Sequence, residues 1–158
     1  MSNALIVDPE KCTSCRLCEL VCSQRNAGAY RPSSSRIEVA VRVDEAIYFP
    51  MACFQCDDAP CMTECSAGAI VRDPVTKVVK ILEEECNECR VCETACPYGV
   101  IRFVDGKAVK CEHCGGDPEC VRFCVPGALR YAPAEEWSVP QRQSYADRLR
   151  QLCGEARS

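Results

Sequence analysis

Of the 17 cysteines in this chain, all but Cys153 stand in four short groups, and their spacing constrains the fold more than any other feature. The groups are Cys12, Cys15, Cys18, Cys22; Cys53, Cys56, Cys61, Cys65; Cys86, Cys89, Cys92, Cys96; and Cys111, Cys114, Cys120, Cys124. The first and third read C-x2-C-x2-C-x3-C, whereas the second and fourth have longer middle gaps of four and five residues. This alternation indicates a unit of two groups that has been duplicated.

The composition indicates that something other than an apolar core holds the chain together. Leu, Ile, Val and Phe supply 33 of 158 residues, close to the level at which apolar burial no longer offsets chain entropy. Cross-links or bound metal could supply the missing stability. Disulfides need an oxidising compartment, and the start MSNALIVDPEKC lacks the basic residues and apolar run of a signal peptide. We therefore expect reduced cysteines, a cytoplasmic location and bound metal.

The spacing within each group is typical of ligands for [4Fe–4S] clusters. Three thiolates at C-x2-C-x2-C can each reach a different iron of one cubane, and the fourth cysteine of such a run ligates the other cluster in two-cluster ferredoxins. Structural zinc typically uses two C-x2-C pairs separated by a dozen or more residues, whereas here all four thiols lie close together. The sixteen grouped cysteines predict four [4Fe–4S] clusters, and a zinc-binding module is the alternative.

Short strands are predicted between the cysteine groups. Segments 69–82 and 100–110 read as hairpins, the second turning at Asp105-Gly106, and 37–43 alternates as a single strand. The groups themselves are expected in loops and single helical turns, and the one long helical pattern runs from about 141 to 153. We predict an α+β chain: a duplicated bacterial 2[4Fe–4S] ferredoxin-like fold, with short hairpins, cluster-binding loops and a C-terminal helix.

A glycine follows three of the four groups at the same place. Gly68, Gly99 and Gly127 each stand third after the last cysteine of their group. Glycine at this place fits a turn of positive φ that leads into a strand. The first group lacks it, since Gly28 comes six residues after Cys22. The chain is therefore expected to leave the first group in a different way.

Two pairings of the groups are possible. The stretch between Cys65 and Cys86 resembles the hairpin linker inside a two-cluster ferredoxin, which pairs groups two and three and leaves one and four to close around them. The sequential pairing, one with two and three with four, stays open.

From Cys12 to Cys124 the chain resembles the four-cluster subunits of the dimethyl sulfoxide reductase iron–sulfur family, which serve molybdenum and tungsten oxidoreductases, hydrogenases and carbon monoxide dehydrogenase. The resemblance implies nested pairing. Its ligand sets would be Cys12, Cys15, Cys18 with Cys124; Cys111, Cys114, Cys120 with Cys22; Cys53, Cys56, Cys61 with Cys96; and Cys86, Cys89, Cys92 with Cys65. The short length resembles the small subunit of bacterial tungsten aldehyde oxidoreductase.

The resemblance implies electron transfer without catalysis. No glycine-rich nucleotide fingerprint accompanies the cysteines, because Gly115-Gly116 belongs to the stretched loop of the fourth group. The single histidine, His113, lies in the same loop, where Cys111 and Cys114 already complete the ligand pattern. We expect a relay subunit of an oxidoreductase complex, between a large catalytic subunit and a redox partner such as a flavin subunit or a ferredoxin. A freely diffusing polyferredoxin shuttle, a cluster-bearing scaffold, and a subunit of a hydrogenase or carbon monoxide dehydrogenase are the alternatives.

The chain is predicted to divide into a four-cluster domain at 1–132 and a docking tail at 133–158. In the tail, Tyr145, Leu149 and Leu152 fall on one face of a helix. This face either packs on its own domain or binds a partner subunit or a second copy of the chain. Cys153 is interpreted as a plain thiol.

Charge excludes one class of partner. The net charge is −4 and no Lys/Arg block is present, so nucleic acid is not expected as a partner. No segment reaches membrane-spanning length, so no direct membrane insertion is expected. Five cations lie next to or within the cysteine groups: Lys11, Arg16, Arg90, Lys110 and Arg122. Each is interpreted as an ordinary solvated charge, and the alternative is that such cations compensate the negative charge of the clusters.

Overall fold

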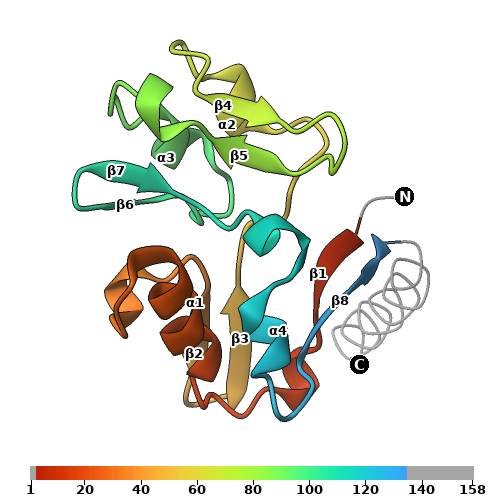
Figure 1. The fold of residues 1–158 in the computed structure, drawn as a ribbon. Helices are drawn as coiled ribbons and strands as arrows, with labels where there is room; N and C mark the ends of the chain where they lie inside the picture. The colour runs from red at the N-terminus through yellow and green to blue at the C-terminus, as the bar shows by residue number, and fades with distance from the viewer. Residues whose placement is uncertain (1–2, 135–158) are drawn as a thin grey trace, which may run out of the picture.

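A computed structural model describes residues 3–134 of the chain, which form helices, 3-10 turns and paired strands (Figure 1). The strands are β1 (Asn3–Val7), β2 (Glu38–Arg42), β3 (Ile47–Met51), β4 (Ile70–Arg72), β5 (Val79–Ile81), β6 (Arg102–Val104), β7 (Lys107–Val109) and β8 (Leu129–Pro133). The α-helices are α1 (Leu17–Ala27), α2 (Pro60–Thr63), α3 (Val91–Ala95) and α4 (Glu119–Arg122). The 3-10 turns are η1 (Pro9–Lys11), η2 (Pro32–Ser34), η3 (Glu83–Glu85) and η4 (His113–Gly116).

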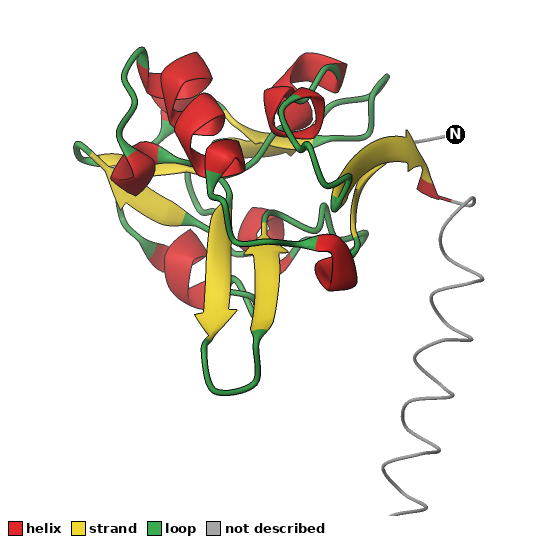
Figure 2. Ribbon diagram, turned by 90° about the horizontal axis from the view of Figure 1, so that it is seen from below, coloured by secondary structure: helices red, strands yellow, loops and turns green. Residues whose placement is uncertain are grey.

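Within these residues the strands pair only in twos. The sheets β1–β8, β2–β3, β4–β5 and β6–β7 are all antiparallel. Seen from below, the short helices lie among these ribbons instead of forming a separate layer (Figure 2). Sheets of two short strands are marginal by themselves, so the loops between them must contribute much of the packing.

The described residues build two lobes, each with its own core (Figure 1). The first lobe holds α1, β1–β8, β2–β3 and α4, and its core consists of Cys18, Cys22, Ile37, Val39, Ala52, Cys111, Cys120 and Leu129. The second lobe holds α2, α3, β4–β5 and β6–β7, and its core consists of Ala59, Ile70, Val79, Ile81, Cys92, Ile101 and Ala108. Further cysteines pack against both cores. Sulfur therefore occupies much of the interior that aliphatic side chains would otherwise fill.

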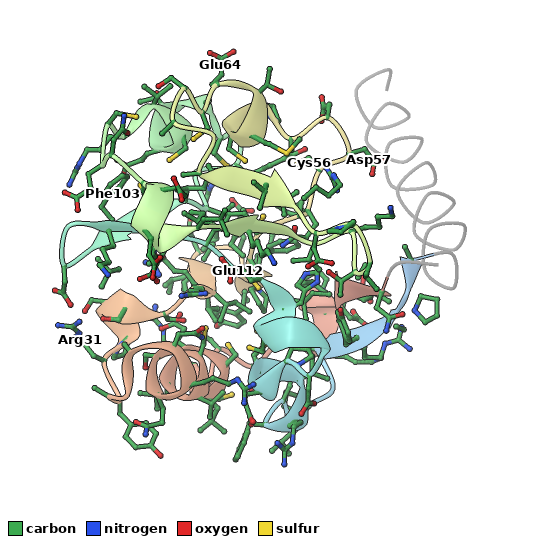
Figure 3. The ribbon with its side chains drawn as sticks, turned by 45° about the horizontal axis from the view of Figure 1, so that its top comes forward. Arg31, Cys56, Asp57, Glu64, Phe103 and Glu112 are labelled. Carbon is green, nitrogen blue, oxygen red and sulfur yellow. The ribbon has the colours of Figure 1, made fainter. Side chains whose placement is uncertain are left out.

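Polar contacts join the two lobes. Glu112 lies near the centre of the molecule (Figure 3), where its carboxylate accepts the backbone N–H of Ile81 at 3.1 Å and lies 3.4 Å from the Arg36 guanidinium. At one side Arg31 pairs with Asp105 at 2.7 Å. Glu112 thus links the edge of β5 in the second lobe to the chain before β2 in the first.

Several local predictions are confirmed. The hairpin β4–β5 lies within 69–82, β6–β7 lies within 100–110, and β2 lies within 37–43. Asp105 and Gly106 turn the β6–β7 hairpin with φ of 50° and 86°, both in the left-handed region. The glycines after groups two, three and four have φ between 61° and 70° and precede β4, β6 and β8. The chain leaves the first group through a helix that ends at Gly28.

Other features were not predicted. Helix α1 has 11 residues and carries Cys18 and Cys22, so the expectation of single helical turns for every group was wrong. The sequence also gave no indication that β1 pairs with β8, in a register that joins Asn3 to Pro133 and Val7 to Leu129. This sheet joins the two ends of the described chain. The predicted helix at 141–153 and Cys153 lie outside the described residues.

Candidate cluster-binding sites

Two sets of four cysteines each surround a cavity. One cavity, which we call site 2, is lined by Cys53, Cys56, Cys61 and Cys96, so the last cysteine of group three stands with the first three of group two. The other cavity, which we call site 1, is lined by Cys12, Cys15, Cys18 and Cys124, so the last cysteine of group four stands with the first three of group one. In both sites, three sulfurs come from one loop and one from a distant group.

The remaining cysteines gather in the same crossed manner. In site 3, burial raises the pKa of Cys92, and the nearby thiols Cys86, Cys65 and Cys89 raise it further. Near site 4, burial raises the pKa of Cys120, with further contributions from Cys111, Cys22 and Cys114 and from Cys18 of site 1. We use the name site 3 for Cys86, Cys89, Cys92 and Cys65, and the name site 4 for Cys111, Cys114, Cys120 and Cys22.

Local structure positions the last cysteines of the first and fourth groups. Cys18 and Cys22 lie one turn apart on α1, and both are buried. The Cys22 sulfur accepts the backbone N–H of Arg36 at 3.2 Å, while the Cys124 sulfur accepts the N–H of Leu129 at 3.3 Å. Backbone donors thus hold these two sulfurs in place.

The loops between the cysteines have an unusual backbone. The residue just before the second cysteine of each group is left-handed although none is glycine, namely Ser14, Gln55, Glu88 and His113, with φ between 54° and 59°. Arg16 and Arg90 are left-handed as well. Such conformations cost free energy and persist where the surroundings require them. Turns that alternate right- and left-handed residues point successive N–H groups into an anion-binding concavity, which is common at iron–sulfur sites.

Burial sets the charge state of two of the thiols, Cys18 and Cys111. Desolvation raises the pKa of Cys18 and of Cys111 to about 12, and in each case neighbouring thiols add to the rise. Without metal these sulfurs are therefore protonated at neutral pH. Iron ligation requires thiolates, so metal must displace these protons.

Two polar side chains near the sulfurs are buried and under-compensated. His113 is 2% exposed, and neither ring nitrogen has a hydrogen-bond partner among the described residues. Burial and the nearby Lys110 lower its pKa to about 4, so the ring is neutral. Lys110 is 1% exposed and lines site 2. Buried donors and charges of this kind are costly unless something compensates them, and an anionic sulfur-rich cluster in the neighbouring sites would do so.

The interpretation of the five cations as solvated charges was wrong for one of them. Lys11, Arg16, Arg90 and Arg122 have side chains at least 54% exposed, and each lies within 4 Å of a carboxylate three residues away. Lys110 instead lies on the buried face that it shares with Ala108, two residues earlier. The period of two along β7 could have indicated this burial.

The arrangement fits the cubane clusters that the spacing predicts. Each site offers four sulfurs and a loop with left-handed backbone, and both suit an anionic cluster. Within residues 3–134, no group of three or more His, Cys, Asp or Glu side chains is placed to hold a single metal ion. In a cubane each thiolate binds a different iron, so its ligands stand farther apart than those of one ion. The same part of the chain contains no helix long and apolar enough to cross a membrane.

Comparison with known proteins agrees with this geometry. Residues 44–134 match the family model described as a 4Fe-4S dicluster domain, and residues 5–24 match a 4Fe-4S binding domain. The first match covers more than half of the 158 residues. The chain belongs to the 4Fe-4S dicluster domain family. The predicted [4Fe–4S] cofactors and the iron–sulfur, ferredoxin-like character of the chain are thereby confirmed.

Similar proteins are named as electron carriers or as subunits of oxidoreductases. The polyferredoxin-like subunit of aliphatic sulfonate oxidoreductase from Pyrococcus furiosus is 41% identical over 76% of this chain and 70% of its own length. Electron transport protein HydN of Escherichia coli is 30% identical over 82% of this chain and 87% of its own. This chain is a ferredoxin-like electron-transfer protein of the same kind.

Two further matches involve a larger protein or a lower sequence identity. The beta subunit of NADH-dependent phenylglyoxylate dehydrogenase from Aromatoleum evansii is 35% identical, but the match spans only 30% of that subunit. Among solved structures, a chain of the active-site complex BamBC of benzoyl coenzyme A reductase is 20% identical over 99% of this chain, with a TM-score of 0.48.

Proposed function

We propose that the chain carries four [4Fe–4S] clusters and serves as the non-catalytic electron-transfer subunit of a larger, cytoplasmic oxidoreductase. The observation that supports this proposal is the crossed lining of two cavities, in which the last cysteine of one group stands with the first three of another. The mutual effects of the remaining cysteines on their pKa values support the same arrangement for sites 3 and 4. The ligands would be the members of sites 1, 2, 3 and 4 as defined above. Bound clusters supply one-electron redox centres. The protein residues hold them, donate hydrogen bonds to them and limit their contact with water.

Contacts between sites support an order along the molecule. Cys53 of site 2 packs against the core that contains Cys111 of site 4, and Gln55 donates a hydrogen bond to the Cys111 carbonyl at 2.8 Å. Cys18 of site 1 lies on α1 and Cys120 of site 4 lies on α4, and these two helices pack together in one core. Helices α2 and α3, which carry parts of sites 2 and 3, pack together. The proposed order is site 3, site 2, site 4, site 1.

The two ends of this row are the surfaces suited to electron exchange. Cys89 of site 3 and Cys15 of site 1 are exposed, whereas Cys111 and Cys120 in the middle are buried. We propose that one end faces the catalytic subunit and the other a redox partner, such as a flavin subunit or a ferredoxin. The nesting of groups one with four and two with three supports a duplicated ferredoxin-like fold.

The finer family placement is also a proposal. The motifs resemble those of the dimethyl sulfoxide reductase iron–sulfur family, and a tungsten aldehyde oxidoreductase is the catalytic partner we propose. The relative in aliphatic sulfonate oxidoreductase supports a place in a multi-subunit enzyme. HydN is a similar protein named for electron transport, and the match covers 87% of its length. A free shuttle is therefore the second candidate. Residues 1–132 would be the cluster domain, and 133–158 a tail that docks on the partner or on a second copy.

Anaerobic purification from the native host tests the proposal. We expect about sixteen iron atoms per chain, reversible reduction followed by EPR, and co-elution with a large subunit on gel filtration. A Cys153→Ser variant should keep all of its iron. Zinc in place of iron, or clusters that do not accept electrons reversibly, would contradict the proposal. Elution of the loaded chain alone would favour the shuttle.

A further inference from the structure

Lys110 is a buried cation without an acidic partner among residues 3–134. It follows β7 directly, is 1% exposed, and ranks among the largest fully buried side chains of the described residues. Its ammonium donates hydrogen bonds to the backbone carbonyls of Val79 and of Cys111, the latter at 3.1 Å. Two carbonyl oxygens do not neutralise a charge, and an uncompensated charge in the interior is strongly unfavourable.

The surroundings of Lys110 indicate what compensates it. The side chain lines the cavity of site 2 together with Cys53, Cys56, Cys61 and Cys96. Most of the other lining residues are apolar, such as Val79 and Ile101. An ammonium has three N–H donors, and the described residues accept two of them. The charge of Lys110 opposes the effect of burial on Cys61 by lowering the pKa of that thiol.

The other cations near the cysteine groups differ from Lys110. Arg90 near site 3 and Arg16 near site 1 have side chains 63% and 54% exposed, and each pairs with a glutamate. Solvent and these carboxylates screen their fields. Lys110 is buried and has no carboxylate partner among the described residues, so its field on site 2 is screened less than the fields of these arginines.

We propose that the Lys110 ammonium is the fixed counter-charge of the cluster in site 2 and raises the reduction potential of that cluster above the value that its loop alone would set. The inference rests on the proposed occupation of site 2 by a [4Fe–4S] cluster. Reduction adds one electron to the site without making or breaking a bond at Lys110. A buried positive charge stabilises the reduced, more negative form more than the oxidised one.

A potentiometric titration followed by EPR tests this role in the full-length, cluster-loaded protein. Lys110→Met removes the charge at similar volume, and Lys110→Gln removes it while keeping a donor for the two carbonyls. We expect the reduction potential of one of the four clusters to fall by at least 59 mV, which is a tenfold shift of a one-electron equilibrium toward the oxidised form. The shifted signal should be the one that disappears in Cys56→Ser. Lys107→Met is the matched control, since Lys107 is 60% exposed and pairs with Glu83 on the surface. It should change the redox equilibrium of each cluster by no more than about twofold.

The outcomes separate a charge effect from a structural one. Lys110→Gln with four clusters and a lowered site 2 potential supports the proposal, as does loss of the site 2 cluster alone from both variants. Four clusters at unchanged potentials in either variant would overturn it, and so would loss of all clusters, which would make Lys110 a structural residue. Failure of the proposed function would appear separately, as an iron content well below sixteen in the unmodified chain.

Discussion

Gln55 lines site 2, and its side-chain hydrogen bonds link that site to site 4 and to the second lobe. Removing the side chain should lower the stability of the folded protein. Its amide nitrogen donates to the carbonyl of Cys111 at 2.8 Å, and its amide oxygen accepts the backbone N–H of Val79, also at 2.8 Å. Val79 is 1% exposed, so in Gln55→Ala its N–H group would lose its partner away from water. The Cys111 carbonyl would keep its bond from Lys110 at 3.1 Å.

The magnitude follows from this asymmetry. An orphaned buried N–H costs about 1–3 kcal/mol, whereas loss of one bond at a carbonyl that keeps another partner costs about 0.5–1.5 kcal/mol. We therefore expect Gln55→Ala to lower the free energy of unfolding by about 1.5–4.5 kcal/mol. For a chain of this size that corresponds to roughly 3–18 °C in the unfolding midpoint. Alanine and glutamine tolerate the left-handed φ of 54° about equally, so the difference reports the side-chain bonds.

The assay is the loss of visible cluster absorbance on heating under anaerobic conditions. Loss of the clusters makes unfolding irreversible, so the unmodified chain and the variants must be compared at one scan rate. Gln24→Ala is the control, because Gln24 is exposed on α1. A midpoint for Gln55→Ala within about 2 °C of the control would show that water replaces both bonds, and the reasoning from burial would fail.

Two further predictions concern the cysteines. Cys96→Ser should remove the cluster of site 2 and leave that of site 3, since Cys96 lines the site 2 cavity although it belongs to the third group; EPR of the reduced variant would contradict the crossed arrangement if only the site 3 signal were lost. Iron uptake during anaerobic reconstitution should fall as the pH is lowered from about 9 to about 6, because burial raises the thiol pKa of Cys18 and Cys111 to about 12 and iron must displace their protons. An uptake that does not change with pH would show that proton release does not limit cluster insertion.

Local features were readable from the sequence because they depend on neighbouring residues. The turn at Asp105-Gly106 requires left-handed backbone at two adjacent positions, and this sequence pair supplies it. The cysteine spacing is likewise a local property, and it led to the [4Fe–4S] cofactor that the family match confirms. The sorting of sixteen cysteines into particular sites remains a prediction, which the crossed gathering of sulfurs in the structure supports.

Features that depend on distant residues were hidden. The strands β1 and β8 pair although they stand at opposite ends of the described sequence, and no residue pattern in either segment indicates this pairing. Helix α1 was hidden for another reason, since its buried positions include polar side chains. Glu19 is 3% exposed and accepts the N–H of Val39 at 2.7 Å, while Ser23 is fully buried and donates to the carbonyl of Leu20 at 2.8 Å. A pattern of apolar spacing cannot reveal a helix whose buried face carries these groups.

Lys110 shows how the two kinds of information combine. Its place beside Cys111 was evident from the sequence, yet the same adjacency holds for Lys11 and Cys12, and Lys11 is exposed beside Asp8. The two lysines differ because of long-range packing. The Val79 carbonyl, which accepts a hydrogen bond from the Lys110 ammonium, belongs to β5 in another hairpin. Burial of this charge therefore depends on the folding of the second lobe around site 2. If an anionic cluster compensates the charge, the lobe and the cluster stabilise each other, and removal of iron should destabilise the second lobe more in the unmodified chain than in Lys110→Met.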